Sequence, residues 1–127
     1  MPLVKINLRT GRSKETKTAI ADAIQASLVK VLEIPDADRY AMINEYDDQH
    51  FIHSGEYLDL KYTKDLLMIE ITFIEGRPEE KKKELIKEIN DRLVSTGYVR
   101  EDDVFVMIFE VAKANVSFGK GLAQRAL

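Results

Sequence analysis

The sequence contains no cysteine and no tryptophan among its 127 residues, and only two histidines. The absence of cysteine excludes disulfides, thiolate metal sites and thiol nucleophiles. The histidines, His50 and His53, do not by themselves make a metal site, because such a site needs three or four ligands. Cysteine is therefore excluded as a nucleophile, and only two histidines are available as imidazole bases.

Proline, glycine and long apolar runs are also scarce, with 3 Pro and 6 Gly. The hydrophobic share of 45% and charged share of 32% are typical of a globular chain and exclude extensive disorder. No stretch approaches the roughly 18 apolar residues of a membrane helix, and Lys5 and Arg9 interrupt the N-terminal segment where a signal peptide needs an apolar run. We therefore expect a soluble, cytoplasmic protein with no membrane partner. The net charge of -3 gives no reason to expect a nucleic-acid partner.

What the sequence does contain is an internal repeat. The segment that begins Gly11-Arg12 corresponds to the one that begins Gly76-Arg77, and this shift of 65 residues gives twelve identities across residues 2–45. Internal self-similarity at a fixed shift indicates a structural unit that is used twice. We expect one domain over residues 1–127, made of repeats at about 2–60 and 66–127.

Each repeat predicts a strand, a helix and a second strand. Residues 2–9 alternate between apolar and polar, which indicates a strand, and apolar residues three and four apart then indicate a helix. The expected strands are 2–9, 40–46, 66–74 and 104–111, and the expected helices are 14–32 and about 78–95. Two such units predict an α+β fold, β-α-β-β-α-β, with a four-stranded sheet and both helices on one face. The stretch 115–127 forms either a short hairpin or an arm.

Several of the predicted strands carry apolar residues on both faces. Leu67-Met68-Ile69 and the run 104–109 are nearly continuous apolar stretches. The sheet face without helices therefore needs cover, and packing against copies of the chain predicts an oligomer.

Pro2 is the residue with the most unusual placement. It follows Met1, which is normally removed when the next residue is small, and removal would leave Pro2 with a free secondary amine at the start of a strand. A free α-amine has a reference pKa of about 7.7–8.0. Nearby cations and an apolar pocket lower such a pKa, and a base with a pKa near 7 can abstract and return a proton at neutral pH. The alternative is that Pro2 only starts an edge strand.

Arg12 and Arg77 occupy equivalent junctions between a strand and a helix. An arginine there can grip a carboxylate with two hydrogen bonds, or it can pair on the surface with the first helical turn, at Glu15 or Glu80. Asp38 and its counterpart Asp103 precede the second strand of each repeat, where turn or cap chemistry and a local Asp38–Arg39 pair are the alternatives to a functional role.

With these features together, the chain resembles the tautomerase superfamily. PLVKINLRTGRSKETK resembles a 4-oxalocrotonate tautomerase subunit, and IEITFIEGRPEEKKKELIKEIN resembles a second copy with Leu67 in the place of the proline. Residues 35–40 (PDADRY) and 117–121 (SFGKG) resemble P-x-x-D-R-Y and S-F-G-R-G of the fused branch that contains malonate semialdehyde decarboxylase. Two residues depart from that branch: Glu75 stands where it has a second arginine, and Val116 where it has a tryptophan.

The resemblance implies a homotrimer that uses no metal and no organic cofactor. It implies that Pro2 is the catalytic amine, that Asp38 assists it, and that Arg77 binds the carboxylate of the substrate. Glu75 and Phe118 are also expected at the substrate-binding site. Arg12 is expected at that site too, where it would act across an interface between subunits. The alternative is that Arg12 is a remnant of the second site, which lacks the proline.

The function implied is a cofactor-independent tautomerase of small 2-oxo acids in which neutral Pro2 is the general base. One alternative is a lyase or hydratase on 3-oxo acids, like malonate semialdehyde decarboxylase, in which Pro2 is protonated. Another alternative is a non-catalytic oligomeric module that binds a small ligand, which gives the N-terminus no role.

Overall fold

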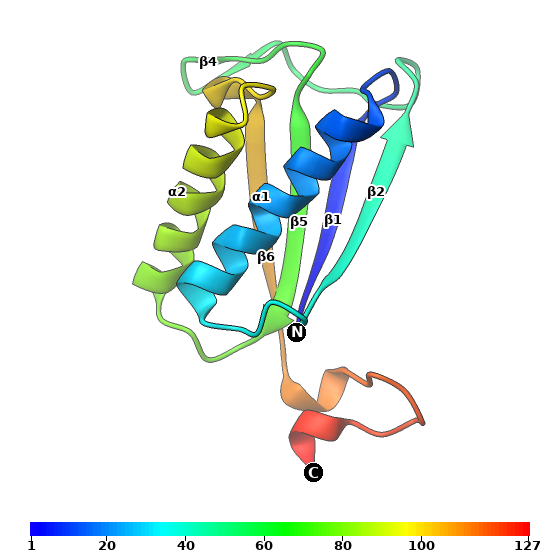
Figure 1. The fold of residues 1–127 in the computed structure, drawn as a ribbon, viewed down its shortest axis with the longest axis vertical. Helices are drawn as coiled ribbons and strands as arrows, with labels where there is room; N and C mark the ends of the chain where they lie inside the picture. The colour runs from blue at the N-terminus through cyan, green and yellow to red at the C-terminus, as the bar shows by residue number, and fades with distance from the viewer.

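Two strand-helix-strand units form one sheet in the computed structural model, which describes residues 1–127 (Figure 1). This confirms the α+β fold. The main elements are β1 (Pro2–Arg9), α1 (Lys14–Leu32), β2 (Tyr40–Tyr46), β5 (Leu67–Ile74), α2 (Glu79–Ser95) and β6 (Val104–Val111). The second unit's first strand begins one residue later than the sequence predicts.

The four strands lie in the order β2-β1-β5-β6. Within each unit the two strands are parallel, as a helical crossover requires, while the central strands β1 and β5 are antiparallel. Pro2 at the start of β1 therefore lies opposite Phe73 near the end of β5, and Asn7 lies opposite Met68. Equivalent residues of the two repeats consequently lie at opposite ends of the sheet.

Local signals fix where the two helices begin. The hydroxyl of Ser13 caps α1 by accepting a hydrogen bond from the backbone N–H of Thr16, at 3.1 Å. Pro78 is the N-cap of α2, where its missing N–H costs nothing. Gly76 has a φ of 126°, a value that favours glycine and turns the chain from β5 toward α2.

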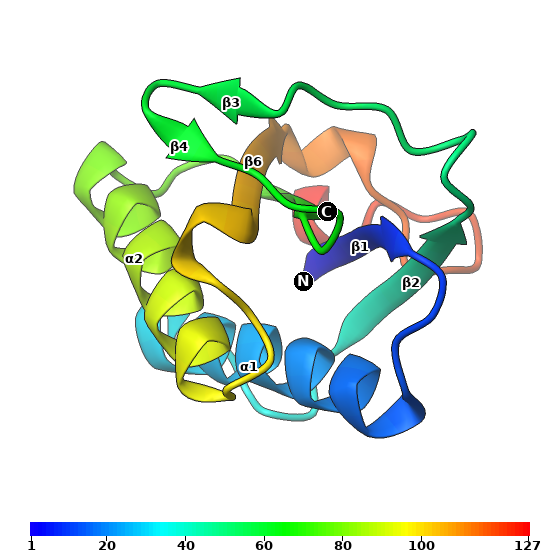
Figure 2. The same cartoon turned by 90° about the horizontal axis from the view of Figure 1, so that it is seen from above.

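The core lies between the sheet and the two helices, which cover the same face (Figure 2). Alternate residues of β1 and β5 point into it and are buried, as the period of two predicts. The fully buried core side chains from the sheet and the helices include Ile6, Leu8, Ile20, Ile69, Ile71, Phe73, Leu85, Ile89 and Leu93.

The other face of the sheet carries exposed apolar side chains. Phe105, Met107 and Phe109 alternate along β6 with residues that pack on the core, and they are 37%, 47% and 42% exposed. With residues of β1, β5 and the segment after β2 they line a groove of about 420 Å³. The expectation that this face needs cover therefore rests on side chains that the chain itself leaves exposed.

Two segments lie outside the repeated units. Residues 47–65 contain a small hairpin of β3 (Glu56–Tyr57) and β4 (Leu60–Lys61). The C-terminal segment, residues 112–127, projects beyond the end of the sheet at which β1 starts (Figure 1). It contains two 3-10 turns, η2 (Lys113–Asn115) and η3 (Gln124–Ala126), and no strand, so the hairpin expected for 115–127 is wrong and the arm is right.

Side-chain bonds explain why no hairpin forms in this segment. Gln124 accepts a hydrogen bond from the Phe118 backbone N–H at 3.0 Å and donates one to the Gly119 carbonyl at 2.8 Å. These bonds use backbone groups that a strand ladder would need. Neither α-helix of the chain has the length and apolar character needed to cross a bilayer.

The position of α2 gives a matched test of the packing. Ile89 is fully buried, whereas Ile86, one turn earlier, is 41% exposed. Ile89→Ala should lower the free energy of unfolding by about 2–5 kcal/mol because it leaves a cavity. Ile86→Ala should lower it by about 1 kcal/mol or less. Urea unfolding followed by circular dichroism measures both, and equal losses would contradict the described orientation of α2.

Candidate active site

The N-terminal end of β1 brings the chain's amino group to a carboxylate. Pro2 is buried as the first residue of β1, and Met1 precedes it. The amino group of Met1 donates a hydrogen bond to Oδ2 of Asp38 and forms an ion pair with it. Asp38 stands just before β2, whose first residue pairs with Leu3 of β1. The structure thus brings together Pro2 and Asp38, which the sequence places 36 residues apart.

A buried glutamine of α1 holds the loop that carries Asp38. Nε2 of Gln25 donates to the backbone carbonyls of Asp36 at 3.2 Å and Asp38 at 3.0 Å. Arg39 does not pair with its neighbour Asp38, because its guanidinium binds Asp22 of α1 at 2.7 Å. The Asp38 carboxylate is therefore left to the amino group. Gln25 was missed from the sequence, although a polar residue beside an apolar stripe is a signal for such a contact.

Arg77 lies at the same end, in the turn after β5. Its guanidinium carbon is 4.9 Å from the ring centroid of Phe73, the residue opposite Pro2, and its Nη1 donates to the Ile74 carbonyl at 3.4 Å. The surface pair with Glu80 does not form. Apart from the bond to Ile74, the Arg77 guanidinium makes no hydrogen bond to the protein. A cation stacked in this way is held in place and still has donors for an anion.

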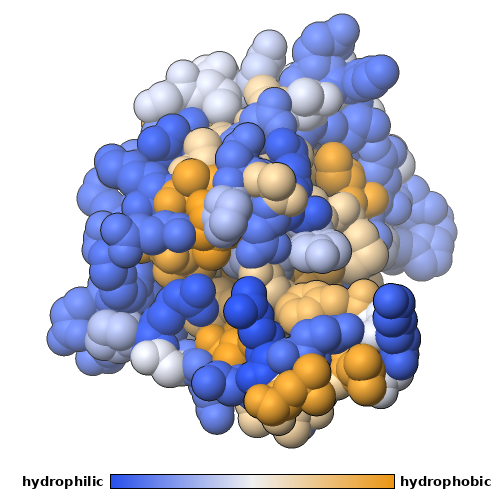
Figure 3. Space-filling model, turned by 60° about the horizontal axis from the view of Figure 1, so that its bottom comes forward, coloured by the Kyte–Doolittle hydropathy of each residue, from blue (hydrophilic) through white to orange (hydrophobic).

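Two cavities meet at Met1. The larger, of about 650 Å³, is lined by Glu75 and Arg77, and the smaller, of about 370 Å³, by Tyr40 and Phe118, whose rings stack at 6.4 Å. The residues that line both cavities are Met1, Pro35, Asp38 and Arg125. Figure 3 brings this end of the molecule forward and shows apolar groups (orange) among hydrophilic ones (blue).

The structure therefore gathers Pro2, Asp38, Glu75, Arg77 and Phe118 at one end of the sheet. Two further cations at this end, Lys113 and Arg125, were missed from the sequence. They belong to the C-terminal segment, and no motif or periodicity marks them. Only the path of the chain after β6 places them beside Met1.

Arg12 lies at the opposite end of the sheet, after β1. It does not pair with Glu15; its Nη2 donates to the backbone carbonyl of Asp65 and lies 3.9 Å from Oδ1 of the same residue. It lines a polar cavity of about 340 Å³ with Arg9 and Lys64. Within one chain, the structure does not bring Arg12 to Pro2.

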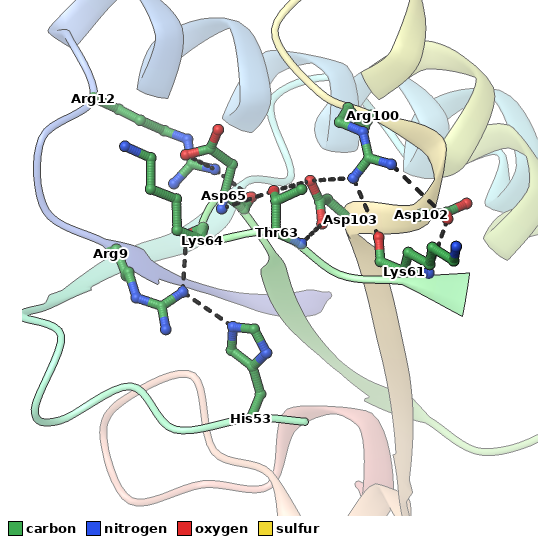
Figure 4. A network of polar contacts seen from close by, with 10 residues as sticks. All are labelled: Arg9, Arg12, His53, Lys61, Thr63, Lys64, Asp65, Arg100, Asp102 and Asp103. Carbon is green, nitrogen blue, oxygen red and sulfur yellow. Dashed lines mark hydrogen bonds and ion pairs between the residues drawn. The ribbon is translucent and has the colours of Figure 1, made fainter. Parts of the chain in front are cut away.

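Buried side chains close the position of the second repeat that corresponds to the Pro2 end, and Figure 4 shows the polar contacts of one of them, Asp103. Leu67, the counterpart of Pro2, and Asp103, the counterpart of Asp38, are both fully buried. Asp103 accepts hydrogen bonds from the backbone N–H of Thr63 at 2.9 Å, from its hydroxyl at 2.6 Å and from Nη1 of Arg100 at 3.2 Å. In the second repeat, Thr63 thus binds the Asp103 carboxylate. In the first repeat, the equivalent carboxylate of Asp38 binds the amino group.

Arg9 fastens the segment that closes this end. Its guanidinium donates to the Lys64 carbonyl at 2.9 Å and contacts Nε2 of His53 at 3.0 Å (Figure 4). It also donates to the Phe51 carbonyl at 2.9 Å. The other histidine, His50, bonds Asp47 and thereby lowers the pKa of that carboxyl below its ordinary value. Both histidines of the H-x-x-H pair therefore have protein partners.

Comparison with known proteins agrees with this geometry. Two family models, each described as "Tautomerase enzyme", match residues 2–61 and 38–119. The probable tautomerase YusQ of Bacillus subtilis (strain 168) is 34% identical over 98% of both chains. The crystal structure of FG41 malonate semialdehyde decarboxylase inhibited by 3-bromopropiolate is 35% identical, covers 98% of this chain and 94% of its own, and superposes with a TM-score of 0.89. A fused 4-OT symmetric trimer is 25% identical, with 98% of both chains covered and a TM-score of 0.80.

The chain therefore belongs to the tautomerase family and to its fused-repeat branch. The resemblance drawn from the Gly-Arg turns, the PDADRY segment and the SFGKG segment is confirmed. Membership supports an enzyme of the isomerase type.

The closed end of the second repeat gives a test. Thr63→Val removes the hydroxyl that donates to the buried Asp103 carboxylate, and it should lower the free energy of unfolding by about 1–3 kcal/mol. Thr63→Ser keeps the donor and should cost about 1 kcal/mol or less. Chemical denaturation at neutral pH compares them, and a Thr63→Val protein as stable as the parent would show that the hydroxyl does not serve Asp103.

Proposed function

We propose that the chain is a cofactor-independent tautomerase of small 2-oxo acids in which the amine of Pro2 is the general base. The observation that carries the proposal is the placement of the chain's amino-terminal end beside both the Asp38 carboxylate and the Arg77 cavity. An amine, a carboxylate and a guanidinium in one cleft supply a base, a group that orients it and an anion site.

Removal of Met1 is the first step of this proposal. The Met1 side chain is only 11% exposed and lines both the larger and the smaller cavity. Its removal leaves the secondary amine on Pro2 and joins the two cavities into one cleft around that nitrogen. Asp38 then faces the space into which a substrate enters.

The proposed reaction moves one proton. Neutral Pro2 takes the proton of an enol hydroxyl, and the electron pair of that O–H bond forms the carbonyl. The electrons of the carbon–carbon double bond then take the proton back from the Pro2 nitrogen at carbon 3. Arg77 binds the carboxylate of the acid and stabilises the negative charge that develops on the neighbouring oxygen. Asp38 accepts a hydrogen bond from the protonated amine and orients it.

A homotrimer of two-repeat chains is part of the proposal, with repeats at about 2–60 and 66–127. The exposed side chains of β6 give the uncovered face an apolar surface for copies of the chain, and the similar fused 4-OT structure is a symmetric trimer. In such an assembly Arg12 either meets the Pro2 cleft of a neighbour or remains with Asp65 as a remnant of the closed site.

A decarboxylase or hydratase of 3-oxo acids is the second candidate. The 35% identity to FG41 malonate semialdehyde decarboxylase favours it, as does the resemblance of PDADRY and SFGKG to the motifs of that branch. In that reaction protonated Pro2 polarises a carbonyl or supplies a proton. Glu75 weighs against it, because an acid stands where that branch has a second arginine.

The role of Pro2 is tested with phenylenolpyruvate. Mass spectrometry should first show that Met1 is absent. Pro2→Ala should then lower kcat/KM for the enol-to-keto conversion by about 10²–10⁴, the usual contribution of a positioned base. Lys83→Gln, at an exposed position of α2, is the control for the loss of a charge. Equal rates for the parent and Pro2→Ala, or a retained Met1, would refute the proline mechanism.

The two reactions require opposite protonation states of Pro2, so its pKa separates them. A general base at neutral pH should titrate below the unperturbed range of about 7.7–8.0, as followed by 15N NMR of the labelled proline. Release of CO2 from malonate semialdehyde should be slow in the same preparation. A pKa of about 8 or higher together with rapid, Pro2-dependent CO2 release would instead establish the decarboxylase.

A further inference from the structure

We propose that Arg125 is a second carboxylate-binding residue of the Pro2 cleft, and that Gln124 positions it. This inference deepens the proposed function and rests on it. It assigns to the C-terminal segment a cation that neither the repeat nor the Gly-Arg turns supply.

Arg125 lies where the two cavities meet. It lines both of them with Met1 and Asp38, whereas Arg77 lines only the larger and Phe118 only the smaller. Arg125 is exposed, and its guanidinium makes no hydrogen bond or ion pair with the protein. A guanidinium without a partner beside the amino-terminal end is available to an anion in the cleft.

The neighbouring residue fixes the segment that carries Arg125. Gln124 is bonded through both ends of its amide, to the N–H of Phe118 at 3.0 Å and to the carbonyl of Gly119 at 2.8 Å. The loop and the turn η3 are thereby tied together, and the Phe118 ring rests on Tyr40 at 6.4 Å. Arg125 therefore belongs to a segment that is tied together internally and rests on β2 through Phe118.

The charges of the larger cavity explain why a second cation is needed. Glu33, Asp38 and Glu75 line it against Lys113, Arg77 and Arg125. Without Arg125 the acids outnumber the cations, and a carboxylate substrate would meet net repulsion. With Arg125 the charges are equal, and two guanidinium groups face one anion. Arginine is also the residue that binds a carboxylate with two parallel hydrogen bonds.

This arrangement predicts the kind of substrate. The carboxylate of a 2-oxo acid lies between Arg77 and Arg125, and the rest of the molecule extends past the amine toward the stacked rings of Tyr40 and Phe118. Apolar or aromatic substituents at carbon 3 fit that side, because the rings supply contact area there.

The first experiment compares an acid with its ester in the mature, full-length protein. Arg125→Gln should raise KM for phenylenolpyruvate about ten- to a hundredfold, since it removes a charge-assisted hydrogen bond. KM for the methyl ester, which lacks the anion, should not change. For the acid, the KM of Arg125→Lys should lie between those of the parent and Arg125→Gln. The KM of Lys83→Gln should equal that of the parent. Equal effects on acid and ester, or no effect on the acid, would overturn the assignment.

Binding of malonate separates this inference from the proposed function. Titration calorimetry should show malonate binding to the parent and at least tenfold weaker binding to Arg125→Gln. If the parent binds malonate through Arg125 but does not convert phenylenolpyruvate, the proposed function fails and the anion site stands. If Arg125→Gln binds malonate as well as the parent, the anion site fails whatever the activity.

The positioning role of Gln124 is tested by a double-mutant cycle. Gln124→Met should raise KM for the acid and leave kcat and the ester unchanged. In the Arg125→Gln background the same change should have no further effect on KM, because the residue it positions is gone. Additive effects in the double variant would show that Gln124 serves only the stability of the segment.

Discussion

The strands β1 and β5 pair in antiparallel directions, and this pairing decides where the groups of each repeat lie. Each repeat contains a parallel pair of strands, and the two units share one sheet by joining their first strands. Joining them antiparallel places Pro2 opposite Phe73, and the corresponding start of β5 lies at the far end. Two units with the same Gly-Arg turn and the same aspartate therefore present their equivalent groups at opposite ends of one sheet.

The two ends differ in what binds the equivalent aspartates. At one end the carboxylate of Asp38 receives the amino group, and at the other the carboxylate of Asp103 is fully buried. A buried carboxylate is costly unless donors satisfy it. Thr63 and Arg100 supply those donors, and Arg9 fastens the segment that carries Thr63. Thr63, in the segment 47–65, thus binds the aspartate of the second repeat, whereas the equivalent aspartate of the first repeat binds the amino group.

The sequence predicts what is local and misses what is not. Alternation, helical spacing and the repeat located all four main strands and both helices. Alternation and helical spacing are properties of residues within a single element, so they can be read without knowing the fold. The pairing of central strands is a contact between distant residues, so Arg12 and Arg77 look equivalent in sequence although they lie at opposite ends. Gln25 and Arg125 were missed for the same reason, because their contacts are not local in the sequence. Gln25 bonds a residue 13 positions later, and Arg125 lies beside Met1 at the other end of the chain.

Glu75 shows how a residue distant in the sequence, Arg125, affects the charge of the cavity that both line. In the proposed reaction a carboxylate binds beside Asp38, so cationic side chains must offset the acids around it. With Glu75 in the turn, Arg77 alone is offset by that acid within the same cavity. The compensating charge need not stand in the same turn, because electrostatic balance depends on distance in space and not on position in the motif. Arg125 of the C-terminal segment lines the same cavity as Asp38, and in our proposal its charge offsets that of Glu75 while the Gly-Arg turn stays intact.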